Sequence, residues 1–430
     1  MVLRFISPAA RAAVLLVALL VSSVLCFYGI RNAVAEHAIA QNTLAGYERA
    51  VRLEPANATN WYLLGRYWQY NLQSPDLERA IAYYRRALVQ QPRLADAWLE
   101  LAKAYEAQGQ VSEARNAFIS AQETYPASAE IAWSYGNFLL REDTLGHAFA
   151  KIHSAVLNDP GLAAEAFSRC WRAKPDAQII LDEVIPPSRD DYVAILRELS
   201  ASRLIDPALA VWKRLVALHV RMSPVEVAPF TNTLLRENRL SDLASVWQQA
   251  VTMMPNPPPP DPPGSVLWDG GFESGVTGDA LAWQIPMSRG GVLATIDPSE
   301  KHGGNHSLRL LFSGKDSYNY ADTCHTAIVE PGVSYRLSGW VLTKGLATDE
   351  GIRLRLSFPG KNGVTYVETP DVHGSAPWTR LALLWIAPQE VHVANVCIAR
   401  QSGGSFENAE GSAWVDDISL VPMFQEFPKQ

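Results

Sequence analysis

The sequence predicts a multidomain protein in which an all-α solenoid is followed by an all-β sandwich, with one transmembrane helix at the N-terminus. Three observations predict this: an apolar segment without charges, a 34-residue period, and alternating segments beyond a proline-rich stretch. The 430 residues exceed what one core organises, and the net charge of −7 argues against nucleic acid as a partner. The predicted parts are an anchor or signal peptide at 1–35, helical repeats at 36–255 (clear over 36–160, degenerate over 161–255), a linker at 256–264 and a sandwich at 265–424.

The N-terminal segment 12–30 contains 19 residues without a charge. As a helix it is about 28 Å long, which matches the hydrocarbon core of a bilayer. Arg4 and Arg11 precede it and Arg31 follows it, a bias that places the N-terminus inside and the body outside. We expect a single-pass protein of a bacterial inner membrane with a periplasmic body. A cleaved signal peptide is the alternative, because the A-x-A sequence at 33–35 is typical of a cleavage site.

The segment after the anchor repeats itself every 34 residues, with small residues, large apolar residues and prolines at matching positions. Small residues let two antiparallel helices approach, large ones fill the space between them, and a proline ends the second helix. One such unit cannot bury its own apolar face, so the units have to stack. The recurring positions are Ala80, Ala114 and Ala148; Tyr84, Phe118 and Ile152; Ala87, Ala121 and Ala155; and Pro92, Pro126 and Pro160.

This pattern resembles the tetratricopeptide repeat, in which paired helices form a solenoid with a concave groove. The resemblance implies a protein or peptide partner bound through the repeats, but the repeat signature names core residues and no groove residue. Beyond residue 160 the period fades, although "DPALAVWKRLVAL" and "DLASVWQQAVTMMP" still match the second helix of a pair. We expect Trp212 and Trp247 to occupy the large apolar positions of these two helices.

Seven of the nine residues at 255–263 are proline. Such a segment favours the extended polyproline II conformation, which spaces domains semi-rigidly at about 3.1 Å per residue. We therefore expect this linker to hold the C-terminal domain away from the end of the helical repeats.

Beyond the linker, short apolar segments alternate with clusters of turn-forming residues. In "GIRLRLSF" every second residue is apolar, so one face of this strand is buried while Arg353, Arg355 and Ser357 face solvent. The segments "HSLRLLF", "SYRLSGWVL" and "VHVANVCIA" have the same strand character. Many short strands separated by turn signals predict a β-sandwich.

The order of motifs in this half resembles jelly-roll carbohydrate-binding modules and related galactose-binding-like domains. The opening "WDGGFESG", the turn "KHGGNHSLRL", the strand "VEPGVSYRLSGWV" and the closing "AWVDDISLVP" follow one another over 266–423 as they do in that family. The resemblance implies an antiparallel jelly roll whose ligand is a glycan or another envelope component. In such modules aromatic rings stack on sugar rings, and polar neighbours bond the sugar hydroxyl groups.

Five residues are candidates for sugar binding. Tyr318 and Tyr320 lie in the polar segment "SGKDSYNYAD", whose composition suits an exposed aromatic platform, and Trp340 is a third candidate ring. Arg353 and Arg355 suit an acidic sugar, and the alternative for them is a plain solvated face. Exposure of the three rings favours a sugar site, whereas their burial favours a sandwich that only docks to protein.

The family resemblance also implies a structural calcium ion that joins the opening and closing strands. Glu273 in the opening motif and the pair Asp416 and Asp417 in the closing motif match its positions. Carboxylate oxygens are hard ligands that suit calcium. The alternative is that these acids cap turns or bond nearby backbone. Asp269 stands where the family usually has asparagine, and its role stays open.

Cys324 and Cys397 both fall in predicted strands of the sandwich, and an oxidising compartment would allow a disulfide between them. The sequence does not give their separation, so free thiols are the alternative. Cys26 in the membrane segment and Cys170 on a predicted helix are expected to be free. Four cysteines exclude a fold that is built on disulfides.

The sequence contains no G-x-S-x-G, H-E-x-x-H, P-loop or dinucleotide-binding motif. We therefore expect a non-catalytic, membrane-anchored envelope scaffold that binds a protein through its repeats and a glycan or envelope component through its jelly roll, with a role in surface polysaccharide biogenesis. One alternative is a protein–protein assembly factor whose jelly roll has no sugar site. Another is a carbohydrate-active enzyme, which needs two carboxylates that face each other across a cleft.

Overall fold

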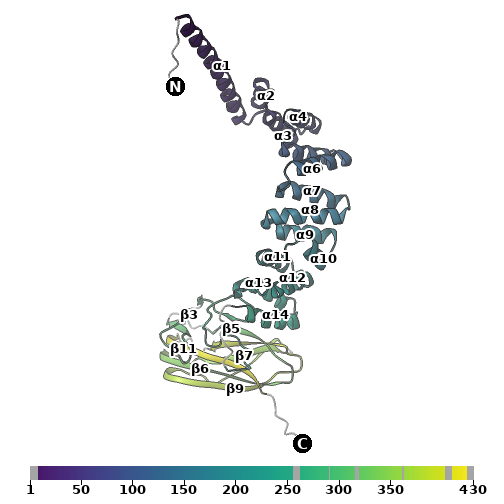
Figure 1. The fold of residues 1–430 in the computed structure, drawn as a ribbon. Coiled ribbons are helices and arrows are strands. Elements are labelled where there is room, and N and C mark those ends of the chain that lie inside the picture. Colours follow the sequence, from purple (N-terminus) through teal and green to yellow (C-terminus); the bar gives the residue numbers. More distant parts are fainter. Residues whose placement is uncertain are drawn as a thin grey trace. The chain divides into compact units, whose positions relative to one another are not determined.

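The computed structural model contains helices in its N-terminal part and strands in its C-terminal part (Figure 1). It forms two compact units, Met1–Pro186 and Pro187–Gln430. The division falls inside the range that the sequence assigns to degenerate repeats, and the predicted domain boundaries stay predictions. The described residues are 8–254, 262–289, 291–314, 319–360, 363–401 and 409–423.

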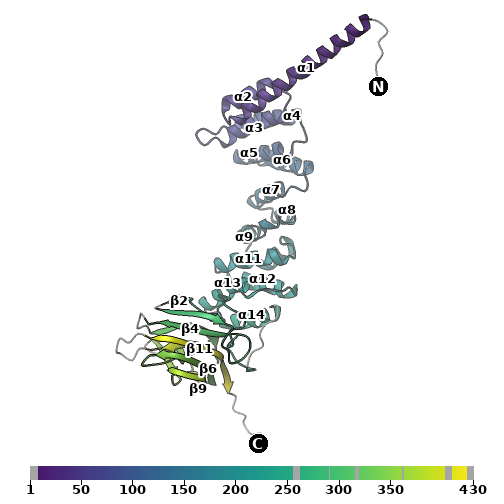
Figure 2. The ribbon, with the colours of Figure 1, turned by 90° about the vertical axis from the view of Figure 1, so that its left-hand side faces the viewer.

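The first unit consists of helices that follow one another in sequence order, each beside its neighbour (Figures 1 and 2). Side chains cap several of their N-termini: Thr43, Asn57 and Asp76 each accept a hydrogen bond from a backbone N–H of the first turn. The helices are α1 Pro8–Ala40, α2 Leu44–Leu53, α3 Ala58–Tyr70, α4 Leu77–Gln90, α5 Ala95–Ala107, α6 Val111–Thr124, α7 Ala129–Arg141, α8 Leu145–Asn158, the short 3-10 helix Pro160–Leu162, α9 Ala163–Ala173 and α10 Ala177–Glu183.

The recurring small and large residues form the core of this unit, which confirms the period predicted from the sequence. The recurring alanines and the large residues that accompany them are fully buried. Gly65 shows why a small residue is needed, because a Cβ there would lie 2.7 Å from the ring of Tyr84 and would push α3 from α4. Gly136 allows α7 to approach Ile152 of α8 in the same way.

The described part of the second unit begins with the helices α11 Arg189–Ala201, α12 Ile205–Ala217, α13 Pro224–Arg236 and α14 Leu240–Met253. The sequence predicts α12 and α14 as second helices of degenerate repeats. Trp212 is buried in α12, and its indole N–H donates to the Gln249 side chain of α14 at 2.7 Å. Helical packing therefore continues where the sequence period has faded.

The strands of the second unit form a sandwich of two antiparallel sheets. In the described residues, one sheet has the order β1-β5-β10-β7-β8 and the other the order β2-β3-β4-β11-β6-β9. Apolar side chains from the facing sides of both sheets form one core. The strands are β1 Trp283–Gln284, β2 Ser288–Arg289, β3 Val292–Asp297, β4 Ser307–Ser313, β5 Tyr320–Ile328, β6 Ser334–Ala347, β7 Arg353–Gly360, β8 Gly363–Glu368, β9 Gly374–Ile386, β10 Val393–Arg400 and β11 Glu410–Met423.

The sandwich is in direct contact with α13 and α14, which corrects the expectation that the linker holds it away from the helices. The Thr231 hydroxyl of α13 donates to Asp279 at 2.6 Å, and the rings of Trp247 and Trp268 lie 5.3 Å apart. Asp279 is 0% exposed, so its carboxyl lies inside the junction, and this burial raises its pKa to about 6. Ring packing and a buried hydrogen bond bring the two parts together. Residues 255–261 of the predicted linker lie outside the described part of the chain.

Candidate functional site

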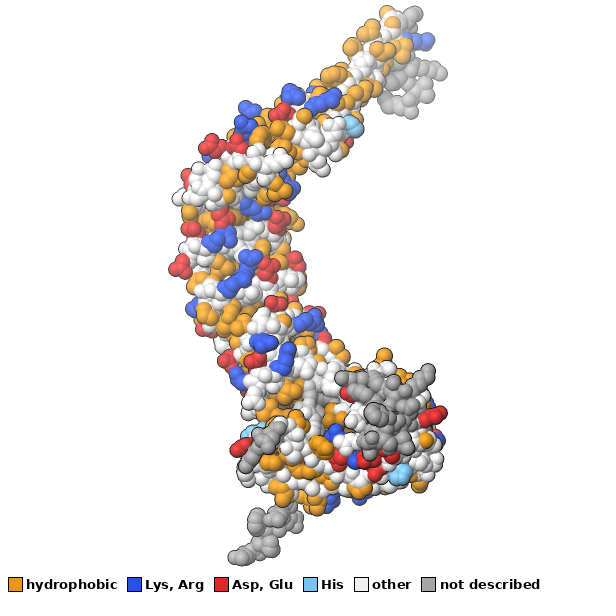
Figure 3. Space-filling view, turned by 180° about the vertical axis from the view of Figure 1, so that it is seen from behind, with side chains coloured by type: hydrophobic (Ala, Val, Ile, Leu, Met, Phe, Trp, Pro, Cys, Tyr) orange, Lys and Arg blue, Asp and Glu red, His pale blue; other side chains and the backbone are white. Residues whose placement is uncertain are grey.

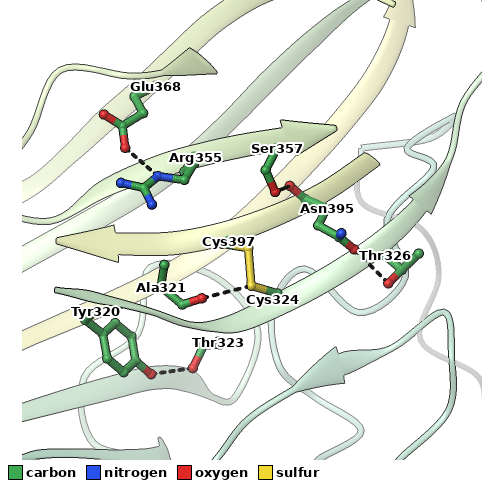
Figure 4. Close-up of a disulfide and its surroundings, with 10 residues drawn as sticks. All are labelled: Tyr320, Ala321, Thr323, Cys324, Thr326, Arg355, Ser357, Glu368, Asn395 and Cys397. Carbon is green, nitrogen blue, oxygen red and sulfur yellow. Dashed lines mark hydrogen bonds and ion pairs between the residues drawn. A yellow bond between two sulfur atoms is a disulfide. The ribbon is translucent and has the colours of Figure 1, made fainter. Parts of the chain in front are cut away.

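The outward face of the five-stranded sheet presents polar side chains in rows. The alternation predicted for β7 explains this, because Leu354 and Leu356 are buried in the core while Arg355 and Ser357 point away from it. Strands β5, β10, β7 and β8 lie side by side, so outward residues at the same register form rows across the sheet (Figure 4).

One row contains uncharged polar side chains and ends on an aromatic ring. Thr326 pairs with Asn395, Asn395 with Ser357, and Ser357 with Tyr366. The Thr326 hydroxyl donates to the Asn395 side-chain oxygen at 2.9 Å (Figure 4). The Tyr366 side chain on β8 is 46% exposed. The row therefore offers hydroxyl and amide groups beside an accessible ring.

The neighbouring row combines an ion pair and a disulfide. Arg355 on β7 donates through Nε to Glu368 at 2.6 Å, and its guanidinium carbon lies 4.5 Å from the centre of the Tyr366 ring. Cys397 pairs with Arg355 on one side and with Cys324 on the other. The two cysteines form a disulfide between β5 and β10 (Figure 4).

Acidic neighbours neutralise both candidate arginines. Arg353 contacts Glu350 at 2.5 Å and Glu368 at 3.2 Å, and Asp371 lies 3.9 Å away. Arg355 shares Glu368. Among the residues described here, these two guanidinium groups are therefore balanced by carboxylates, and an acidic sugar would meet negative charge as well as positive charge.

Two of the three candidate rings lie in described residues, and Tyr318 lies outside them. Tyr320 is 1% exposed, and its hydroxyl lies 2.5 Å from the Thr323 hydroxyl. Burial raises the pKa of Tyr320 to about 12. The candidate role of Tyr320 as a solvent-facing platform is therefore corrected. A register shift between Ile398 and Arg400, opposite Tyr320, breaks the strict alternation of β5 and explains why the ring points inward.

Trp340 belongs to the other sheet, so the structure does not bring it together with Arg353 and Arg355. It lies on β6, and its ring stacks on the His302 imidazole with centroids 4.0 Å apart. Trp378 meets the same imidazole edge-on at 5.7 Å. These contacts cover part of the Trp340 ring.

Glu273, a proposed calcium ligand, accepts hydrogen bonds from the loop before β4. The backbone N–H of Asn305 donates to it at 2.5 Å and that of His306 at 3.1 Å. Burial opposes ionisation, but these N–H donors outweigh it and hold the pKa of Glu273 below its usual range. The opening motif is thereby joined to the loop.

Asp416 and Asp417 bond the same loop from the closing strand. Asp416 accepts the backbone N–H of His302 at 2.7 Å and that of Gly303 at 3.1 Å. Burial, together with the negative charge of Asp417, raises the pKa of Asp416 to about 6. The Asp417 carboxylate lies 2.5 Å from the His302 Nδ1.

Hydrogen-bonding groups therefore already contact all three acids: backbone N–H groups donate to Glu273 and Asp416, and the His302 Nδ1 lies beside Asp417. The described residues contain no group of three or more histidine, cysteine, aspartate or glutamate side chains placed to hold a metal ion.

The structural calcium ion stays a prediction. Thermal melting of the protein with calcium and with a chelator tests it. A fall in Tm on chelation supports a structural ion, and an unchanged Tm leaves the hydrogen bonds alone as the tether.

The helical unit contains a pocket of about 600 Å³ between α4, α5 and α6. Leu88, Leu101 and Trp98 provide apolar lining, and Arg85 and Glu113 provide charged groups. Val89, which also lines it, is 76% exposed. Trp98 and Leu101 belong to the repeat pattern, but the pattern does not include Arg85, Val89 or Glu113, so the sequence alone did not indicate a pocket here.

Comparison of the sequence with protein families gives one match in the helical part. Residues 72–133 match the family model of the tetratricopeptide repeat. The match covers α4, α5 and α6 with the segments beside them, so this part of the chain carries the tetratricopeptide-repeat pattern. Among solved structures, the chain is similar to YrrB, described as a tetratricopeptide-repeat protein with an unusual peptide-binding site, with 13% identity, coverage of 50% of this chain and 95% of that one, and a TM-score of 0.27.

Among solved structures, the chain is also similar to carbohydrate-binding modules. A family 16 carbohydrate-binding module is 19% identical, with coverage of 36% of this chain and 99% of that one and a TM-score of 0.27. A family 22 module of Clostridium thermocellum Xyn10B is 16% identical, with coverage of 38% and 97% and a TM-score of 0.28. No match was found among curated proteins. At these identities and TM-scores, ligand chemistry has to be inferred from the side chains of this chain.

Proposed function

We propose that this protein is a non-catalytic scaffold of the cell envelope that binds a glycan through its jelly roll and a protein through its tetratricopeptide repeats. The observation that carries the glycan part is the row of uncharged polar groups that ends at Tyr366. The apolar α1 and the disulfide support a membrane-attached protein whose body lies in an oxidising compartment outside the cytoplasm. A role in surface polysaccharide biogenesis fits this combination.

The chemistry of the row favours a neutral glycan. Sugar rings expose C–H groups that pack on aromatic faces, and their hydroxyl groups both donate and accept hydrogen bonds. Asn395, Ser357 and Thr326 supply donors and acceptors without charge. Because Glu368 already neutralises Arg355, little attraction remains for a carboxylated sugar.

Replacing Tyr366 by alanine tests the glycan proposal. We expect Tyr366→Ala to weaken binding of a neutral oligosaccharide roughly tenfold or more, because it removes the exposed aromatic face on which a sugar ring would pack. Binding of the full chain in detergent is first screened on an array of neutral and acidic glycans and then measured by calorimetry. Leu384→Ala, which removes a side chain that is 69% exposed on the other sheet, is the matched control.

An equal loss in both variants, or preferential binding of acidic glycans, contradicts this site. Absence of binding to every glycan favours the alternative function, a protein–protein assembly factor whose jelly roll has no sugar site.

The proposal that the repeats bind a protein can be tested at the pocket between α4, α5 and α6. A charged residue introduced there is expected to prevent the partner from docking. We expect Val89→Glu to reduce crosslinking of the partner about tenfold, because a partner that docks on the apolar lining would remove water from the new carboxylate. The measurement is photo-crosslinking in cells from a probe beside the pocket, with Leu157→Glu on α8 as an exposed control. If both variants retain the crosslink, the partner binds elsewhere on the repeats.

A further inference from the structure

The N-terminal helix α1 runs without interruption through two chemically different segments. Over 12–30 its side chains include no charged residue, and its apolar side chains are exposed along the helix (Figure 3). The same helix continues to Ala40. An apolar stretch of this length exposed to water is unfavourable, whereas a bilayer would bury it.

The last turns of α1 pack against α2 as the first helical pair of the first unit. Ala35 and Ala38 are 0% and 2% exposed, in contrast to the apolar residues of the membrane segment. Gly46 of α2 approaches so closely that a Cβ there would lie 2.2 Å from the Ala38 carbonyl oxygen. Asn60 of α3 in turn donates to the Ala50 carbonyl of α2 at 3.3 Å, so the pair is joined to the next one.

The A-x-A sequence lies inside this packed helix. Residues 33–35 are helical, and Ala35 is buried. Cleavage after Ala35 would leave only residues 36–40 of α1, which is little more than one helical turn. Cleavage would also remove the buried Ala35, and Ala38, which meets Gly46, would be left in a single helical turn that is not stable in water by itself.

We propose that α1 is retained in the mature protein and that it passes directly from the membrane into the first helical pair. This inference rests on the proposed membrane attachment and deepens it. The anchor and the first repeat-like pair then share one helix, with no separate linker between them. The residues after the span therefore have a structural role that a removable signal peptide lacks.

The first test is the mass of the purified full chain carrying a C-terminal tag, together with its behaviour on alkaline extraction of membranes. We expect the intact mass in the extraction-resistant membrane fraction. A mature N-terminus at Glu36 overturns the inference. An intact chain that alkali extracts contradicts the proposed membrane attachment itself, so the two failures are distinguishable.

The second test compares two glycines of the N-terminal helices. Gly46→Leu places a side chain where α1 and α2 meet, whereas Gly29→Leu adds one where no atom lies within 4 Å. We expect Gly46→Leu to lower the Tm of the helical part by about 5 °C and to make the segment at 36–43 susceptible to protease. Gly29→Leu should leave both unchanged. Equal behaviour of the two variants overturns the packed helical pair.

Discussion

Loss of the disulfide between Cys324 and Cys397 is expected to lower the free energy of unfolding of the jelly roll by about 4 kcal/mol. The two residues are separated by 73 positions, so the crosslink removes many conformations from the unfolded chain. The measurement is urea unfolding of the full chain carrying Cys324→Ser and Cys397→Ser, followed by tryptophan fluorescence. A small effect relative to wild type would contradict the prediction.

Reduction provides the control for this prediction. A reductant should lower the stability of the wild type to that of the double variant, and it should not affect the double variant. If the double variant is also sensitive, the effect arises elsewhere, since Cys26 and Cys170 are the other cysteines of the chain.

His325 is expected to make the jelly roll less stable as the pH falls from about 6.5 to about 4. Its Nε2 accepts the Trp268 backbone N–H at 3.1 Å, and its Nδ1 lies 2.8 Å from the Thr326 carbonyl, so the folded protein holds one neutral tautomer. Burial lowers the pKa of His325 to about 4. In this window the unfolded state binds a proton that the folded state does not, which removes about 3 kcal/mol of stability.

Other buried groups titrate in the opposite direction, so a variant has to isolate the histidine. The pKa values of Asp279 and Asp416 are raised to about 6, and both groups make folding less favourable as the pH rises from about 4 to about 6. The quantity to measure is the stability of wild type minus that of His325→Gln at pH 7 and at pH 4. We expect it to fall by about 3 kcal/mol. A difference that is equal at both pH values contradicts the prediction.

Protonation of His325 is also expected to affect the contact between the sandwich and α14. Protonation of Nε2 would remove the acceptor for Trp268, and the Trp268 ring packs against Trp247 of α14. Acid should therefore loosen the contact between the sandwich and α14 before the core of the sandwich unfolds. Fluorescence of the tryptophans, recorded beside far-UV circular dichroism, follows the two events separately.

The outward face of the five-stranded sheet illustrates what the alternation of residues in one strand can and cannot predict. The alternation in "GIRLRLSF" placed Arg353 and Arg355 on the side of their strand away from the core, but they do not face solvent freely, because ion pairs with neighbouring carboxylates leave their side chains only 13% and 15% exposed. Tyr366 and Glu368 on β8 went unnoticed, because an alternating segment does not reveal which strand lies beside it. The short hairpin between β7 and β8 was the signal that would have paired them. Once they are paired, Glu368 balances the positive charge of Arg355, which supports the proposal of a neutral ligand.

By itself, the sequence determined the helical period, the alternating strands and the apolar N-terminal segment, because each depends on residues only a few positions apart along one helix or strand. The tertiary structure alone decided which residues meet. A register shift turned Tyr320 inward, strand pairing assembled the row that ends at Tyr366, and helix packing joined the end of α1 to α2. These outcomes depend on contacts between distant segments, and one residue of register is enough to move a side chain from the surface to the core.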